Sequence, residues 1–168
     1  KKSISFLRDL GERYSVSVIQ GVTGSGKTFV YFERIRDIIK KGNQCLIMLP
    51  EIALTNQFSI RFKEFFGTEP AIWHSGTNKK NKSIIWKGVS EGKIKIVIGA
   101  RSSLFLPFKN LGIIIVDEEH DVSYKQDEGI SYNARDMAIT RASLENIPIN
   151  LVTSIPSVET YNNIVNKK

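Results

Sequence analysis

Hydrophobic residues along this chain gather in short runs, which alternate with longer stretches of amphipathic spacing. Several runs consist almost wholly of Ile, Val and Leu. Continuous apolar runs of this length are typical of strands that are covered on both faces, as in a parallel sheet. The pattern predicts strands over residues 15–20, 44–49, 70–73, 95–98, 111–116 and 148–153.

The stretches between these runs carry apolar residues at the three- and four-residue spacing of a helix. The first of them ends in Lys40, Lys41 and Gly42, cations and a glycine that favour a helix C-terminus. Alternating strands and helices predict one compact α/β domain, a mostly parallel open sheet with helices on both faces. Helices are predicted over residues 28–41, 53–66, 79–91 and 133–145, and helical segments open and close the chain.

Length and composition, 168 residues with 41% hydrophobic and 24% charged, are those of a soluble globular domain. No window approaches the ~20 apolar residues of a membrane helix, and no signal peptide is recognisable. The single Cys45 excludes an intrachain disulfide and a multi-cysteine zinc site, and its apolar setting predicts a buried thiol. We expect a cytoplasmic protein without zinc here. Since the chain does not begin with Met, we expect a piece of a longer protein.

The net charge of +7 comes from one region. Residues 61–109 hold ten Lys or Arg against three Glu, and the rest of the chain carries fourteen residues of each sign. A local basic excess is typical of a surface that binds phosphate backbones. The alternative is compositional, because the abundance of Ile, Lys and Asn is that of proteins from AT-rich genomes. Charge alone leaves both open.

A phosphate-binding loop is predicted directly after the first strand. Residues 21–28 satisfy the pattern G-x-x-x-x-G-K-[ST] and open the first predicted helix. Glycines let the backbone wrap around a phosphate with its N–H groups inward, and the helix N-terminus adds positive charge. We expect Lys27 to reach the β- and γ-phosphates of ATP or GTP and Thr28 to ligate Mg²⁺. The predicted nucleotide-binding residues are Gly21, Val22, Thr23, Gly24, Ser25, Gly26, Lys27 and Thr28.

The fifth predicted strand runs into Asp117-Glu118-Glu119-His120. Three acids would be expensive to bury unpaired, and strands of an open sheet end at the ligand crevice, where the phosphate loop also lies. Asp117 is therefore predicted to hold Mg²⁺. Glu118 is predicted to be the general base that deprotonates the attacking water. Lys27, Asp117 and Glu118 form the predicted catalytic set.

The Asp-Glu-Glu-His tetrad downstream of a phosphate loop resembles the DExH group of superfamily 2 helicases. Further segments resemble the PriA family of primosomal replication-restart helicases, over about residues 18–160. The matching segments are residues 21–28, 49–55 (Leu-Pro-Glu-Ile-Ala-Leu-Thr), 73–76 (Trp-His-Ser-Gly), 98–108, 115–126 and 132–136. The resemblance implies a RecA-like P-loop NTPase fold.

The resemblance also implies a function. The chain would be the first RecA-like half of an ATP-dependent 3′-to-5′ DNA helicase that acts in replication restart and primosome assembly. It would use ATP and Mg²⁺, and its partners would be forked or single-stranded DNA, the second RecA-like half of the same protein, which supplies arginine fingers, and other primosome proteins. No membrane partner is implied.

The loops after Leu49 and Ile98 are then expected beside the crevice, on the DNA side. Their small and hydroxyl residues suit contacts to a single-strand backbone without base readout. The predicted DNA-contacting residues are Ala53, Thr55, Arg101, Ser102 and Ser103. An ordinary helix start at residues 50–55 and a surface ion pair for Arg101 stay open. Trp73 is predicted to be a core residue and His74 a structural one, while base stacking by Trp86 stays open.

Residues that couple the nucleotide to the DNA are also implied: His120, Tyr124, Lys125, Gln126, Thr153 and Ser154. His120 as a surface histidine, and residues 121–132 as an exposed connection with two incidental tyrosines, are the alternatives. The family's Gly-Ser-Ala-Thr-Pro-Ser appears here as residues 152–157 with Ile155 in the place of a hydroxyl. Because that side chain cannot hydrogen-bond, Thr153 or Ser154 is the candidate substitute. The resemblance also implies a segment before the phosphate loop with a Gln that reads adenine, and we expect that segment to lie outside this piece of the protein.

Two other functions are consistent with the phosphate loop. One is a nucleotide- and DNA-binding module without turnover on its own. The other is an unrelated P-loop phosphotransferase such as a small-molecule kinase. The kinase alternative leaves residues 99–105 and the acidic tetrad unexplained.

Overall fold

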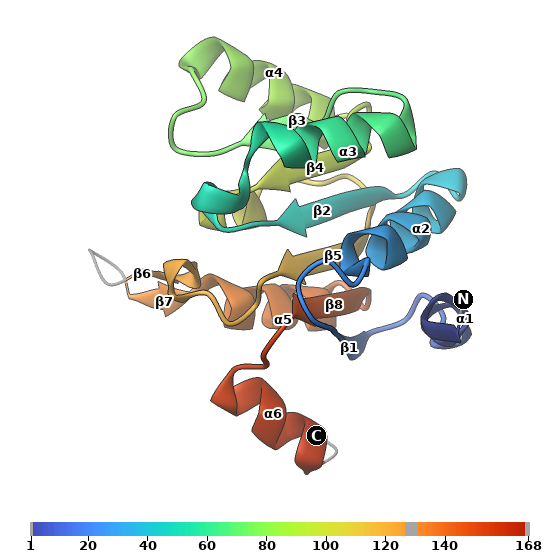
Figure 1. The fold of residues 1–168 in the computed structure, drawn as a ribbon. Coiled ribbons are helices and arrows are strands. Elements are labelled where there is room, and N and C mark those ends of the chain that lie inside the picture. The colour runs from blue at the N-terminus through green and yellow to red at the C-terminus, as the bar shows by residue number, and fades with distance from the viewer. Residues whose placement is uncertain (1, 127–130, 167–168) are drawn as a thin grey trace.

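The computed structural model describes residues 2–126 and 131–166, and its centre is a six-stranded parallel sheet (Figure 1). The strand order is β1-β8-β5-β2-β4-β3. The strands are β1 (Ser15–Gln20), β2 (Gln44–Met48), β3 (Ala71–Trp73), β4 (Ile96–Gly99), β5 (Leu111–Asp117) and β8 (Pro148–Thr153). The predicted bounds are confirmed to within one residue at each end. A separate antiparallel pair is formed by β6 (Lys125–Gln126) and β7 (Tyr132–Asn133).

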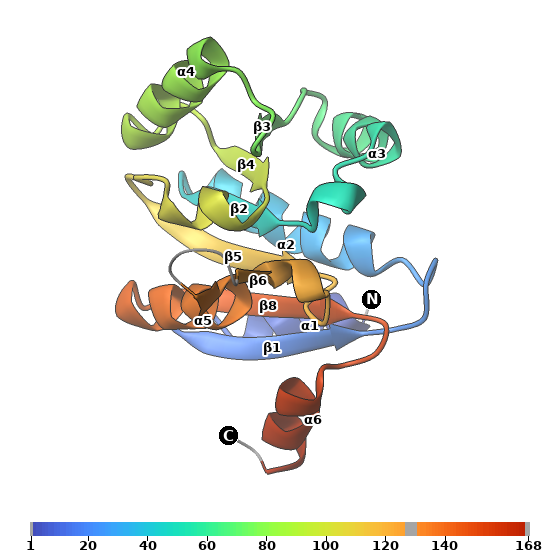
Figure 2. The same cartoon turned by 90° about the vertical axis from the view of Figure 1, so that its left-hand side faces the viewer.

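Helices cover both faces of the sheet, which confirms the predicted α/β architecture. The α-helices are α1 (Lys2–Asp9), α2 (Lys27–Lys40), α3 (Asn56–Phe66), α4 (Lys79–Ser90), α5 (Ala134–Leu144) and α6 (Val158–Val165). Short 3₁₀ turns are η1 (Glu51–Ala53), η2 (Arg101–Phe105) and η3 (Val122–Tyr124). Buried side chains of α1, α2 and α3 pack on one face, and those of α4 and α5 on the other. Figure 2 shows α4 and α5 to the left of the sheet and α3 to its right.

The central strands are buried at every position, which explains why their sequences are largely apolar. Gln44 is the polar exception in β2. Its side-chain amide donates to the carbonyls of Val89 and Ile94, at 3.0 and 2.7 Å. Its side-chain oxygen accepts from the backbone N–H groups of Lys109 and Asn110, at 2.9 and 3.0 Å. A fully bonded amide of this kind holds the loops before β4 and β5 against β2 without leaving a polar atom unpaired.

The third helix begins three residues later than predicted. Thr55 caps α3 by accepting a hydrogen bond from the Phe58 amide at 3.3 Å. The residues before it, 51–53, form η1 as a separate turn after Pro50. The η1 turn and the Thr55 cap therefore lie where the spacing predicted the start of the helix.

All six strands run in the same direction, so their C-terminal ends meet at one edge of the sheet. Strand β8 lies between β1 and β5 and pairs with both. The loop after β1 is tied to the end of β8, because the Gly21 amide donates to the Thr153 carbonyl at 3.2 Å. This arrangement brings the phosphate loop and the acidic tetrad to the same edge. Among the described helices, none is long and apolar enough to span a membrane.

Candidate active site

The loop of residues 21–26 connects β1 to the N-terminus of α2. Gly24 and Gly26 adopt left-handed backbone angles, with φ of 80° and 85°. A Cβ at Gly21 would lie 2.5 Å from the Ser25 hydroxyl oxygen, so a side chain there would require the Ser25 side chain to move. The glycine spacing thus produces a tight loop whose amides lie at the positive end of a 14-residue helix. The loop therefore has the backbone shape expected of the phosphate cradle that the sequence predicts.

The Lys27 side chain lies back over this loop. Its ammonium donates to the carbonyls of Gly21 and Val22, at 2.7 and 3.3 Å. The cation is therefore held beside the glycine turn and near Asp117, whose carboxylate feels its charge.

Tyr31, to which the sequence analysis gave no role, links α2 to one of the predicted metal ligands. Its hydroxyl donates to Asp117 Oδ2 at 2.8 Å, and Thr28, the other predicted ligand, lies three residues earlier on the same helix. Burial raises the pKa of Asp117 to about 6, and the Glu118 charge adds to that rise, while the Tyr31 hydrogen bond opposes it. Burial also raises the pKa of Tyr31, so its proton stays on and faces the carboxylate.

Glu118 has an unusual backbone conformation. Its φ is 49°, in the left-handed region that a non-glycine residue adopts at a cost of about 1–3 kcal/mol. Its amide donates to Asp117 Oδ1 at 3.0 Å. The side chain is 38% exposed, whereas its two acidic neighbours are buried. The turn therefore presents one of the three carboxylates to the solvent side of the sheet edge.

His120 and Thr153, both predicted to couple nucleotide and DNA, are in direct contact. Nδ1 of His120 lies 2.8 Å from the Thr153 hydroxyl oxygen, and that hydroxyl donates to the Ile155 carbonyl at 2.7 Å. Because the hydroxyl hydrogen is used there, Nδ1 is the donor to Thr153. His120 Nδ1 is also 3.8 Å from Glu118 Oε2. Ser154 is half-buried after β8, and the Ile155 side chain is exposed.

Glu119 has a role that the sequence analysis did not predict. Its buried carboxylate accepts from Arg135 Nη1 at 3.2 Å, from the Ser157 amide at 2.8 Å and from the Thr160 hydroxyl at 3.0 Å. These three bonds tie the end of β5 to the starts of α5 and α6. The sequence analysis gave Arg135 no role beyond its place in the predicted helix over residues 133–145. The sequence offered one general signal for this pairing. A buried acid requires a cation, and none lies next to Glu119 along the chain.

Tyr124 is fully buried, so the alternative of an incidental surface tyrosine is wrong for it. Its hydroxyl lies 2.6 Å from the Asp117 carbonyl and 3.0 Å from the Met48 carbonyl, joining the ends of β5 and β2. Lys125 is exposed and its carbonyl accepts from Arg101 Nη1 at 2.5 Å, while Gln126 is half-buried in β6. The middle of the predicted DNA-sensing segment, residues 127–130, lies outside the described residues.

The predicted DNA-contacting residues differ in exposure. Thr55 and Ser102 are exposed, and Ala53 and Arg101 are half-buried. Ser103 is fully buried, and its hydroxyl donates to the Ala100 carbonyl at 2.6 Å within η2. A DNA contact through the Ser103 hydroxyl is therefore wrong, because the 3₁₀ turn directs it inward.

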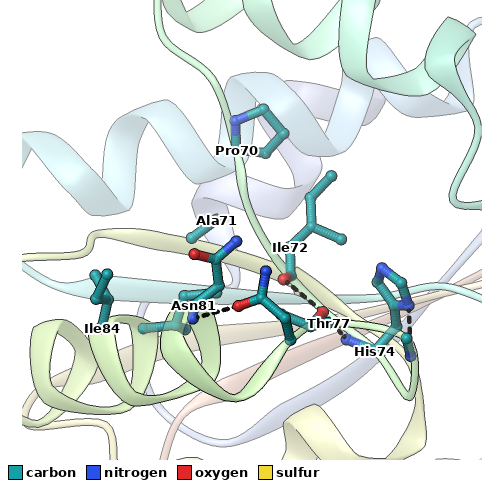
Figure 3. A pocket seen from close by; sticks show the side chains of 10 residues that line it. Pro70, Ala71, Ile72, His74, Thr77, Asn81 and Ile84 are labelled. Atoms are coloured by element: carbon teal, nitrogen blue, oxygen red, sulfur yellow. Dashed lines mark hydrogen bonds between the residues drawn. The ribbon is translucent and has the colours of Figure 1, made fainter.

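His74 is a structural residue, as predicted. Its Nδ1 accepts from the Gly76 amide at 3.1 Å, and its own amide donates to the Thr77 hydroxyl at 3.1 Å. Figure 3 shows this turn beside the open edge of β3, where the Thr77 hydroxyl also meets the Ile72 carbonyl. The turn and Asn81 line a hollow between β3 and α4, away from the phosphate loop.

Curated relatives are similar to this chain in sequence. The chain is 56% identical over 155 residues to Replication restart protein PriA of Rickettsia conorii, an alignment that covers 92% of this chain and 24% of that protein. It is 42% identical to the protein of the same name from Bacillus subtilis, over 89% of this chain and 19% of that one. The chain thus spans about a quarter or less of the length of these relatives. The predicted resemblance to PriA proteins is confirmed.

Among solved structures, RecG bound to a three-way DNA junction has a similar fold. The TM-score is 0.68 at 23% sequence identity, over 97% of this chain and 22% of that one. The DEAD/DEAH box helicase family matches residues 7–155, which is most of the chain. The chain therefore belongs to the DEAD/DEAH box helicase family.

Proposed function

We propose that this chain is the ATP-binding half of a two-part DNA helicase motor. The observation that carries the proposal is the hydrogen bond between Tyr31, on the helix that the phosphate loop opens, and Asp117 of the acidic tetrad, at 2.8 Å. Thr28 lies three residues before Tyr31 on that helix, and the charge of Lys27 acts on Asp117. A phosphate cradle and a hard-oxygen pair at one sheet edge suit Mg·ATP.

The residues present fit the cofactor. The loop amides and Lys27 would bind the phosphates, and oxygens of Thr28 and Asp117 would hold the metal. Bound Mg²⁺ would neutralise charge on the β- and γ-phosphate oxygens. Glu118, the exposed carboxylate of the tetrad, would orient a water molecule and take its proton. The arginine finger that stabilises the γ-phosphate would come from a second RecA-like half.

The DNA side of the proposed motor is the neighbouring part of the same edge. Ala53, Thr55, Arg101 and Ser102 would contact the backbone of a single strand. Their position would be reported to the nucleotide site through two contacts: the Arg101 bond to the Lys125 carbonyl, next to Tyr124, and the His120–Thr153 bond. The first leads through Tyr124 to the Asp117 carbonyl, and the second ends at His120 of the tetrad.

For the whole protein we propose 3′-to-5′ unwinding of forked DNA in replication restart, together with other primosome proteins in the bacterial cytoplasm. Support comes from the identity of 56% and 42% to proteins named Replication restart protein PriA. The motor half would act together with the remainder of such a protein.

Nucleotide binding is tested with the chain and a fluorescent ATP analogue in the presence of Mg²⁺. Lys27→Ala should weaken binding roughly ten- to a hundredfold, since it removes charge-assisted bonds to phosphate. The matched control is Lys40→Ala, which deletes an exposed lysine at the far end of the same helix. Equal affinity of Lys27→Ala and the wild type would refute the phosphate-loop assignment.

A further inference from the structure

Helix α4 carries a basic and aromatic surface that the proposed motor has not yet used. Its sequence, KKNKSIIWKGVS, contains four lysines and no acid. Lys79, Lys82 and Trp86 are spaced by three and four residues, so they lie along one face of the helix. The Trp86 side chain is 49% exposed. We call Lys79, Lys82, Trp86 and the adjoining Trp73 the tryptophan platform.

The two rings of the platform hold each other in place. Trp73 and Trp86 have ring centroids 6.3 Å apart at an interplanar angle of 42°. The Lys82 ammonium lies 5.8 Å from the centre of the Trp73 ring, on the same side as α4. A half-exposed indole that is already oriented by a neighbour loses little freedom when a flat ligand stacks on it.

The platform is joined to the predicted DNA-contacting residues. Trp73 Nε1 donates to the Ser102 hydroxyl at 3.1 Å. Lys82 Nζ donates to the Ser75 carbonyl at 3.2 Å, and the Ser75 amide donates to Glu51 in η1 at 3.4 Å. Strands β3 and β4 end side by side here, with Trp73 opposite Gly99. The platform therefore continues the same sheet edge from η1 and η2 outward to α4.

We propose that the tryptophan platform extends the single-strand path, with a base stacked on Trp86 and phosphates bound by Lys79 and Lys82. This inference rests on the proposed function, since it takes the DNA side of the motor as its starting point. The occupant is anionic because α4 carries four lysines and no acid. Lys87 pairs at 3.9 Å with Glu91, which follows the helix, whereas Lys79 and Lys82 lie along the platform. It is single-stranded because an exposed indole stacks on a base only when the base has left its duplex. Stacking of this kind tolerates every base, which suits a translocating motor.

The test uses the chain and a fluorescein-labelled 20-nucleotide oligo(dT), with affinity measured by anisotropy at several salt concentrations. Trp86→Ala should weaken binding about five- to a hundredfold without changing the salt dependence. Trp86→Phe should retain most of the affinity, because it keeps an aromatic ring. Lys79→Gln and Lys82→Gln should each lower the slope of log affinity against log salt by about 0.7.

Matched controls remove the same chemistry elsewhere. Lys40→Gln deletes an exposed lysine at the opposite edge of the sheet, and Phe6→Ala deletes an aromatic ring that is 60% exposed on α1. Neither control should change affinity. A thermal melt of each variant should show that it is fully folded at the temperature of the binding measurement.

Two failures are distinguishable. If Thr55→Ala and Arg101→Ala weaken binding while the platform variants match the controls, the platform proposal is overturned and the proposed DNA path stands. If the wild-type chain does not bind the oligonucleotide even at low salt, both proposals are overturned together.

Discussion

Asp117 holds its proton more tightly than an exposed carboxyl does. Its pKa lies about two units above the ordinary value near 3.8, at about 6, because the side chain is buried beside Tyr31 and next to Glu118. An unfolded chain releases that proton near its ordinary pKa. Between pH 4 and pH 6 the folded chain therefore binds the proton that the unfolded chain has lost, and stability falls as the pH rises through this window.

Asp117→Asn should accordingly stabilise the chain at pH 7.5 by roughly 1–3 kcal/mol, and should leave stability unchanged near pH 4. The amide keeps one oxygen for the Tyr31 hydroxyl and carries no charge to bury, which outweighs the loss of the bond from the Glu118 amide to the second carboxylate oxygen. The measurement is urea unfolding at both pH values in EDTA without nucleotide. Equal stability of the two proteins at pH 7.5 would contradict the burial argument.

Residue roles could be predicted from the sequence where a local pattern defines them. The glycine spacing around Lys27 indicated the cradle, and the acids after a buried strand indicated Asp117. Tyr31 was missed because a tyrosine on the apolar face of a helix looks the same whether or not its hydroxyl meets an acid 86 residues away. Ser103 was misplaced for a related reason, since only the three-dimensional turn of η2 decides which of two adjacent serines faces inward.

At the scale of elements, α6 is fastened to the acidic tetrad by one buried carboxylate. Glu119 bonds the Ser157 amide at the N-cap of α6 and the Thr160 hydroxyl in its first turn, and its charge is balanced by Arg135. The helix is otherwise poorly covered, with Thr160 as its one buried residue.

Glu119→Ala should therefore cost about 3–5 kcal/mol of unfolding free energy, because it leaves Arg135 without its buried partner. Glu145→Ala is the matched control, since it breaks an exposed Arg–Glu pair of 2.6 Å that is worth less than ~1 kcal/mol. Urea midpoints of the two variants provide the comparison. If Glu119→Ala loses no more unfolding free energy than the control does, the hydrogen bonds of Glu119 do not hold α6 in place.

Element boundaries followed the sequence closely where burial was uniform and less closely where capping intervened. Strands such as β5, buried at every position, were predicted to within a residue. Helix α3 was predicted from residue 53 because the apolar spacing extends that far, whereas the Thr55 cap and the η1 turn start it at Asn56. Contacts between distant elements, such as the hydrogen bonds from Glu119 to α6, leave no periodic signal in the sequence.

At the scale of the molecule, hydrolysis should need more than this chain. An arginine finger is worth about 10³–10⁵ in rate, and we assign no arginine here to that role. In a chimera where this chain replaces the matching segment of the Rickettsia conorii relative, DNA should stimulate steady-state phosphate release. Glu118→Gln in that chimera should retain Mg·ATP binding and abolish release, whereas the chain alone should show little turnover with or without DNA.

The native Rickettsia conorii protein serves as the reference for activity. Robust DNA-stimulated turnover by the chain alone would mean that the site is complete, and the two-half proposal would have to be abandoned. Normal hydrolysis by the Glu118→Gln chimera would place the general base elsewhere.

The position of β8 has a consequence for the order of events during synthesis. Strand β8 separates β1 from β5 in the sheet, and its pairing joins Ser15 to Pro148. The phosphate loop leaves the ribosome early and the acidic tetrad much later, yet the two cannot be set side by side until residues 148–153 have also emerged. A chain cut just before Pro148 would contain every residue of the phosphate loop and the tetrad and still lack the strand between them. The ability to bind nucleotide should therefore arise in a single late step of synthesis.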